Sequence, residues 1–174
     1  MPTWTMIGIE GVAICDVERY EDARGENLVL GVGMAPLPRS ETFVHENCSV
    51  SHRDVLRGIH ADPTTWRLMT CLLGRLYFVV VNCRESSPLF GWWKAFVLSD
   101  SSRQHILVPP GYGSAHLVLS DRAVLLYHWS QMYDQARQTI YRYDDPRFHI
   151  HWPMSGREPI LSERDRTAGG VNHD

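Results

Sequence analysis

The sequence predicts an all-β fold, either a β-sandwich or a small barrel. Short apolar segments recur along the chain, and turn-forming residues separate them. Several of these segments are rich in valine, and hardly any stretch has the spacing of a helix. Many short strands of this kind are typical of sandwiches and small barrels, whose sheet edges must be closed or covered.

The expected strands are short and follow one another at regular spacing. Residues 67–83 contain two apolar stretches that are interrupted at Gly74 and Arg75. The second stretch, 76–81, is apolar at every position, which favours a strand covered on both faces. The complete set of expected strands is 42–44, 55–59, 67–73, 76–81, 94–98, 104–108, 116–119 and 123–129.

Polar and proline-rich segments predict the connections. We expect a turn at 85–88, a polar loop at 99–103 and a rigid bend at 109–113. The residues 120–122 predict a hairpin that joins the last two strands. Towards the C-terminus the chain is irregular, and residues 162–166 predict one short helical turn.

Length and composition fit one globular domain, residues 1–174. The chain has 174 residues, 44% of them hydrophobic, and a formal net charge of −3. Without a basic face, nucleic acid is not an expected partner. We expect no membrane span, since no apolar run of about 18 residues occurs, and no signal peptide, since residues 1–12 lack a basic start and an apolar block. The four cysteines form no CxxC pair, which indicates reduced thiols and a cytoplasmic location.

The nine histidines raise the question of a metal site. His149 and His151 form an HxH pair, but they lie beside Trp152 and Pro153 in a segment with no expected strand partner. A metal site needs three or four converging ligands, so we expect none here. No GxSxG nucleophile motif or phosphate-binding loop occurs. A cysteine–histidine nucleophile remains open, although Cys71 and Cys83 lie in apolar runs.

Acid–base chemistry is the remaining option. Arg57 and His60 lie near the end of an expected strand, and histidine titrates near neutral pH. In a regular strand, residues three apart point to opposite faces, so both side chains reach one substrate only if the chain kinks near Gly58. The alternative is a solvated arginine and a loop histidine.

Tyr127 is a second candidate, on the strand face that also carries Leu125 and Trp129. This face points inward if a barrel encloses a ligand. A buried phenol needs a hydrogen-bond partner or a chemical role. A core tyrosine bonded to the backbone is the alternative.

The same segments carry a resemblance to a known family. VLRGIH, SSPLFG, ILVPPGYGSAHLVLSD, LLY, DDPRFHIHWP and PILSERD occur in this order between about residues 24 and 165. This pattern resembles the dTDP-4-dehydrorhamnose 3,5-epimerase family. The resemblance implies a cupin-type jelly roll that acts as a homodimer, without metal or cofactor. The implied substrate is a nucleotide-diphosphate 4-keto-6-deoxy sugar, inverted at C3, C5 or both by proton removal and reprotonation from the opposite face.

The resemblance also implies residue roles. His60 matches the catalytic base, Asp165 the carboxylate that orients it, and Tyr127 the general acid. Arg67 takes the place of a lysine near the ketone, and Arg24 matches a residue that reaches the nucleotide of the dimer partner. The residues with implied substrate contacts are Arg24, His45, Asn47, Arg57, Arg67, Ser114, His116 and Tyr133.

The chain departs from the family pattern at several positions. Ser114 replaces a histidine, Phe78 an aspartate, and Glu26 and Asn27 replace aromatic residues. The variant pattern, with RGE at 24–26, HxD at 60–62, TWRL at 65–68 and a late His116, resembles a branch that acts on GDP-linked 4-keto heptoses. Three other functions remain to be weighed: a nucleotide-sugar 3,4-ketoisomerase, a non-catalytic sugar-nucleotide-binding cupin and a metal-dependent cupin oxygenase.

Overall fold

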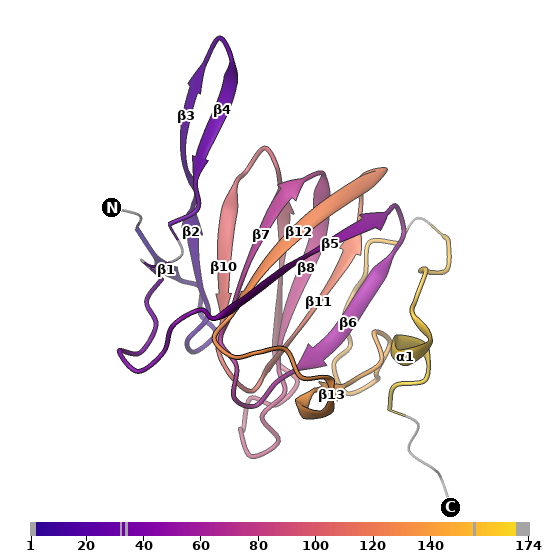
Figure 1. Ribbon diagram of the computed structural model, residues 1–174. Coiled ribbons are helices and arrows are strands. Elements are labelled where there is room, and N and C mark those ends of the chain that lie inside the picture. Colours follow the sequence, from indigo (N-terminus) through magenta and orange to yellow (C-terminus); the bar gives the residue numbers. More distant parts are fainter. Residues whose placement is uncertain (1–2, 32, 34, 155, 170–174) are drawn as a thin grey trace, which may run out of the picture.

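The structure is a computed structural model that describes residues 3–31, 33, 35–154 and 156–169. Within these residues nearly all of the regular secondary structure is β-strand, which confirms the predicted class (Figure 1). One sheet has the strand order β1-β2-β10-β7-β12-β5 and the other β13-β6-β11-β8-β9. The strands are β1 (Thr5–Met6), β2 (Ala13–Asp16), β3 (Glu18–Asp22), β4 (Gly25–Val29), β5 (His45–His52), β6 (Leu56–Ala61), β7 (Arg67–Leu73), β8 (Arg75–Asn82), β9 (Trp93–Ser99), β10 (Gln104–Val108), β11 (Tyr112–Val118), β12 (Arg122–Trp129) and β13 (Thr139–Ile140).

The main core lies between the two sheets. On β8, Leu76, Phe78 and Val80 pack into this core, whereas Val79 and Val81 join a second cluster. The second cluster includes Tyr141 and Phe148, from the segment that follows the last strands. Strand β8 is therefore covered on both faces, as its continuous apolar sequence predicts.

The predicted helical turn is the helix α1 (Glu163–Arg166). The side chain of Ser162 caps it by accepting a hydrogen bond from the backbone N–H of Asp165, which fixes where the helix begins. None of the helices in the described residues is long and apolar enough to span a membrane.

The predicted hairpin between residues 116–119 and 123–129 is wrong. Strand β11 pairs with β6 and β8, whereas β12 pairs with β5 and β7 in the other sheet. The Ser120 hydroxyl accepts a hydrogen bond from the backbone N–H of Arg75 and donates one to the carbonyl of Arg122. The turn therefore carries the chain from one sheet to the other, where each strand has two partners.

The predicted strand at 42–44 is also wrong, since these residues precede β5 and are not in a strand. Strand β5 lies at a sheet edge and is mostly exposed, so its sequence HENCSVSH lacks an apolar alternation. The hairpin of β3 and β4 was missed for the same reason. Its residues are nearly all exposed, and it projects away from the two sheets (Figure 1).

Candidate active site

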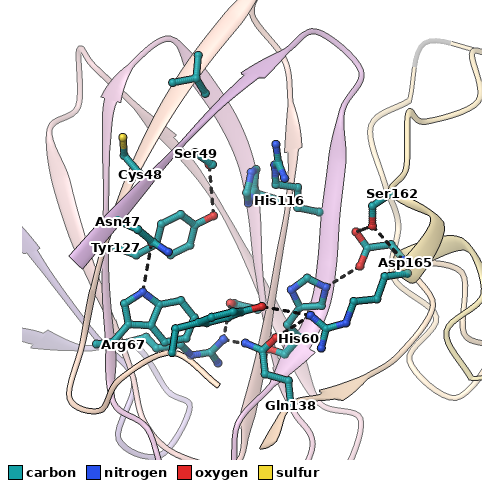
Figure 2. Close-up of a pocket in the computed structure, with 16 residues that line it drawn as sticks. Asn47, Cys48, Ser49, His60, Arg67, His116, Tyr127, Gln138, Ser162 and Asp165 are labelled. Carbon is teal, nitrogen blue, oxygen red and sulfur yellow. Dashed lines mark hydrogen bonds and ion pairs between the residues drawn. The ribbon is translucent and has the colours of Figure 1, made fainter. Parts of the chain in front are cut away.

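A cavity of about 470 Å³ opens between the two sheets, at the end that the main core does not fill (Figure 2). Both sheets contribute to its walls, and α1 and the segment before β13 contribute to its rim. Its lining residues are Asn47, Cys48, Ser49, Val50, Arg57, His60, Arg67, Ser114, His116, Tyr127, Trp129, Tyr133, Gln138, Ser162, Arg164 and Asp165.

His60 and Asp165 form a pair on one side of this cavity. Nε2 of His60 lies 2.5 Å from Oδ1 of Asp165, although the residues are 105 positions apart. The His60 side chain is 27% exposed, whereas the Asp165 side chain is only 4% exposed. A buried carboxylate on Nε2 orients the imidazole and leaves Nδ1 free to accept a proton.

The start of α1 holds Asp165 as a carboxylate. Burial works to raise the pKa of Asp165, and the hydrogen bond with His60 is the largest effect that lowers it. The hydroxyl of Ser162 donates to Oδ2 of Asp165 at 2.9 Å, and the Gly58 N–H also lowers the pKa. The net pKa of Asp165 is therefore below its ordinary value, and the group is negatively charged at neutral pH.

The kink expected near Gly58 is present, and it brings Arg57 and His60 into the same cavity. His60 pairs with Ser114 and Arg57 with His116, so β6 has one more residue than β11 between the two pairs. This extra residue is a β-bulge, which turns both side chains to one face. Gly58 occupies the bulge with a φ of 107°, a conformation that side chains disfavour.

Replacing Gly58 with alanine is expected to lower the free energy of unfolding by about 3 kcal/mol. The new Cβ would lie 2.6 Å from the carbonyl oxygen of Ser114 and 2.8 Å from Cβ of Ala115. Gly25→Ala is the matched control, because Gly25 has a similar φ of 115° but no atom within 4 Å of its added Cβ. We expect Gly25→Ala to cost about 1 kcal/mol in a urea-unfolding measurement. Equal losses for the two variants would show that the bulge is not tightly packed.

Tyr127 faces the cavity from the opposite sheet. It comes from β12, and its ring stacks on Trp129 with ring centroids 6.0 Å apart. Its hydroxyl lies 3.4 Å from the hydroxyl of Ser49 on β5. Burial raises the pKa of Tyr127 above its ordinary value, against the smaller effects of Ser49, Arg57 and Arg67. At neutral pH the phenol is therefore protonated and can donate a proton, and Figure 2 shows it across the cavity from His60.

Arg67 is a buried cation in the cavity wall, only 2% exposed. Its guanidinium donates to the carbonyl oxygens of His60 and Tyr112 and to the hydroxyl of Ser114, at 3.0, 2.5 and 3.1 Å. Burial lowers the pKa of Arg67 to about 10, and the nearby Asp62 opposes this shift. Arg67 thus remains charged at neutral pH and also fixes the strand that carries His60.

Most of the predicted site residues line the cavity. Asn47 accepts a hydrogen bond from Nε1 of Trp129 at 3.3 Å, and Ser114, His116 and Tyr133 lie in the walls or rim. Arg57 donates from Nε to the hydroxyl of Ser51, which leaves its two terminal nitrogens without a partner among the described residues.

His45 and Arg24 do not lie in this cavity. His45 pairs with Trp129 at the start of β5, and it lines a separate shallow groove with Glu46 and His128. Arg24 lies in the turn between β3 and β4, where it forms an ion pair with Asp22 at 2.6 Å. Within one chain this hairpin projects away from the cavity (Figure 1).

Sequence reasoning missed several lining residues. Arg164 belongs to the SERD segment, and the sequence predicted no role for it. Its guanidinium donates to the hydroxyl of Tyr133 at 3.3 Å and to Oε1 of Gln138 at 3.2 Å. No local pattern predicts this contact, because Arg164 lies in α1 whereas Tyr133 and Gln138 lie in the irregular chain before β13. The other missed lining residues are Cys48, Ser49, Val50, Trp129, Gln138 and Ser162; the alternation of Asn47 and Ser49 could have indicated Ser49.

Metal-binding and cysteine-nucleophile sites find no support in the described residues. These residues contain no group of three or more side chains suited to a metal ion, and His149 and His151 are exposed in a loop. Burial raises the pKa of Cys71 and of Cys83 to about 12, so neither forms a reactive thiolate at neutral pH.

Iodoacetamide is expected to modify one thiol of the native protein, Cys48. Cys48 is exposed, whereas Cys15, Cys71 and Cys83 are buried and have raised pKa values. Intact mass measurement should show one adduct in buffer, four in denaturant and none in native Cys48→Ser. Rapid addition of a second label to the native protein would contradict the packing around the buried thiols.

Comparison with known proteins shows the family of the chain. The sequence profile described as dTDP-4-dehydrorhamnose 3,5-epimerase matches residues 6–172. An epimerase of that name from Mycobacterium tuberculosis is 38% identical over 126 residues, which cover 70% of this chain and 62% of the relative. The chain thus spans less than two thirds of that relative's length. A dTDP-4-dehydrorhamnose 3-epimerase from Streptomyces niveus is 34% identical, covering 93% of this chain and 80% of the relative.

The fold has a similar neighbour among solved structures. NovW, a 4-keto-6-deoxy sugar epimerase from the novobiocin cluster of Streptomyces spheroides, superimposes with a TM-score of 0.87 at 34% identity. The match covers 97% of this chain and 86% of NovW. It confirms the cupin-type jelly roll that the family resemblance predicts.

Proposed function

The chain belongs to the dTDP-4-dehydrorhamnose 3,5-epimerase family, and from this premise we propose that it is a nucleotide-sugar epimerase. It inverts C3, C5 or both carbons of a nucleotide-diphosphate 4-keto-6-deoxy sugar, without metal or cofactor. The observation that supports this most strongly is the placement of two proton-transfer groups. The pair His60–Asp165 and the phenol of Tyr127 face one cavity from opposite sheets (Figure 2).

His60 begins the reaction by removing a proton from carbon next to the ketone. Nδ1 takes the proton, and the electron pair of the broken C–H bond moves onto the ketone oxygen to form an enolate. Asp165 stabilises the imidazolium that results, since its carboxylate lies 2.5 Å from Nε2. The positive charge of Arg67 stabilises the enolate oxygen, as fixed cations do at sites of developing negative charge.

Tyr127 completes the inversion by donating its proton to the same carbon from the other face of the ring. The enolate then returns to the ketone, and the phenolate left on Tyr127 lies in the field of Arg57 and Arg67. Solvent restores the phenol and deprotonates the imidazolium. Both groups therefore regain their starting states after each inversion.

The charges of the cavity suit a diphosphate. Arg57, Arg67 and Arg164 line it, and Asp165 is the only carboxylate among the lining residues. We place the phosphates near the free terminal nitrogens of Arg57 and the base near the aromatic pair Trp129 and Tyr133, whose ring centroids are 5.6 Å apart.

The proposal also concerns which nucleotide the substrate carries. The named relatives act on dTDP-linked sugars, whereas the variant pattern at 24–26, 60–62, 65–68 and His116 favours the branch that uses GDP-linked heptoses. The hairpin that carries Glu26 and Asn27 also carries Arg24, which we assign to the nucleotide site of a second subunit in a homodimer. We place the reaction in the cytoplasm, where the four free cysteines stay reduced.

A panel of dTDP- and GDP-linked 4-keto-6-deoxy hexoses and heptoses in deuterated water tests this function. We expect NMR to show deuterium and inverted configuration at C3, C5 or both for at least one nucleotide series. The ratio of kcat/KM between the series assigns the nucleotide, and the labelled carbons give the number of inverted centres. A product with its ketone at C3 instead of C4 would indicate a 3,4-ketoisomerase. Tight binding of the sugar nucleotide without any deuterium exchange would indicate a non-catalytic binding protein. Stoichiometric iron in active protein would instead support an oxygenase.

A further inference from the structure

One histidine in the cavity wall has no role in the proton transfers described above. His116 lies on β11 and is only 3% exposed. Its Nε2 is buried and has no hydrogen-bond partner among the described residues, and none of their hydrogen bonds involves its ring. A buried polar group without a partner destabilises the folded state, so such a group calls for an explanation.

Two other buried histidines provide a comparison. Nδ1 of His105 lies 2.6 Å from the hydroxyl of Thr70, and Nδ1 of His128 lies 3.4 Å from a carboxylate oxygen of Glu46, although Nε2 of His128 is also buried without a partner among the described residues. Neither of these histidines lines the substrate cavity. Of the three, His116 is the one whose ring has a polar partner at neither nitrogen within the described part of the chain, and it is the one that lines the cavity, where a bound molecule can supply a partner.

The position of His116 fits contact with the sugar rather than with the nucleotide. It pairs with Arg57 across β6 and alternates with Ser114, whose hydroxyl is held by Arg67. The charges of Arg57 and His60 both act on it, so it lies near the proposed base. Figure 2 shows His116 on the wall between Tyr127 and the His60–Asp165 pair.

His116 is neutral at physiological pH. Burial is the main cause that lowers the pKa of His116 to about 3, and the positive charge of Arg57 acts in the same direction. A neutral imidazole has one donor and one acceptor nitrogen. A hydroxyl group can use either of them, whereas a phosphate would gain more from the neighbouring guanidinium of Arg57.

We propose that His116 binds a hydroxyl of the sugar ring and thereby selects sugars that carry it, an inference that rests on the proposed epimerase function. In a 4-keto-6-deoxy sugar the hydroxyls beside the reacting carbons are those at C2 and C3. Both offer the same chemistry, so analogues that lack one or the other distinguish them. Sites built around a hydrogen bond to a substrate hydroxyl reject analogues without it, because their own polar group stays unpaired.

The test measures kcat/KM for solvent deuterium exchange with the parent sugar and its 2-deoxy and 3-deoxy analogues. The native enzyme is expected to prefer the parent over one analogue by about ten- to a hundredfold. His116→Phe should lose this preference, because it slows the parent and leaves that analogue nearly unaffected. His116→Gln should recover part of the preference, since its amide can still bond a hydroxyl.

Thermal unfolding separates this role from a structural one. Since His116→Phe removes an unpaired buried group, its melting temperature is expected to equal or exceed that of the native protein. Unchanged preference for the parent sugar in a folded His116→Phe or His116→Gln would overturn the inference while the epimerase function stands. Absence of exchange by the native enzyme with every sugar would instead overturn the function.

Discussion

His60→Asn is expected to slow solvent exchange of the protons beside the ketone by about 10³-fold, with an equal loss of inversion. Asparagine is close in size to histidine and can still hydrogen-bond Asp165, but it cannot accept a proton from carbon. The buried carboxylate keeps a partner, so the fold is expected to persist. NMR in deuterated water measures exchange and inversion in the same sample.

His52→Asn is the matched control for this prediction. His52 ends β5, is exposed and does not line the cavity, so its replacement is expected to leave both rates unchanged. If folded His60→Asn exchanged protons at the native rate, another residue would have to be the base.

Tyr127→Phe is expected to separate proton removal from inversion. The ring still stacks on Trp129, but the donor that faces His60 across the cavity is lost. We expect inversion to fall by about 10²- to 10³-fold. Proton removal by His60 continues, and the enolate that Tyr127 can no longer protonate persists long enough for His60 to exchange its proton with solvent. Deuterium should therefore enter the recovered substrate with its configuration retained.

Tyr77→Phe serves as the control here. Tyr77 lies on β8 and packs edge-on against Trp152, away from the cavity, so its hydroxyl should not affect either rate. Native rates of inversion in Tyr127→Phe would contradict the assignment of the phenol as the proton donor.

Buried elements were predictable from the sequence, whereas exposed ones were not. Residues 76–81 of β8 are all apolar because both faces of the strand are covered. The strand limits predicted from the sequence were therefore nearly correct. Strand β5 and the β3–β4 hairpin are mostly exposed, and their pairing depends on backbone hydrogen bonds that any sequence can form. The error at residues 120–122 has another origin, since a polar turn does not show whether the next strand joins the same sheet.

The site was predictable in part for similar reasons. The need for a kink at Gly58 follows from strand geometry, and the structure has a bulge there. The pair His60–Asp165 joins residues 105 positions apart. Sequence spacing cannot predict such a pair, and only the family resemblance indicated it. The hydrogen bond from Arg164 to Gln138 links α1 to the irregular chain before β13, and neither strand geometry nor the family resemblance predicted it.

The proposed inversion needs one group to remove a proton and another to return one from the opposite face. The position of deuterium in the product of the native enzyme tests this directly. At early times in deuterated water, we expect each inverted carbon of the product to carry one deuterium, while unreacted substrate stays unlabelled. Tyr127 exchanges with solvent and delivers deuterium, whereas His60 returns the original proton when the reaction reverses. Inverted product that retains its original hydrogen would show that one group moves the proton across the ring, and the two-sided mechanism would be wrong.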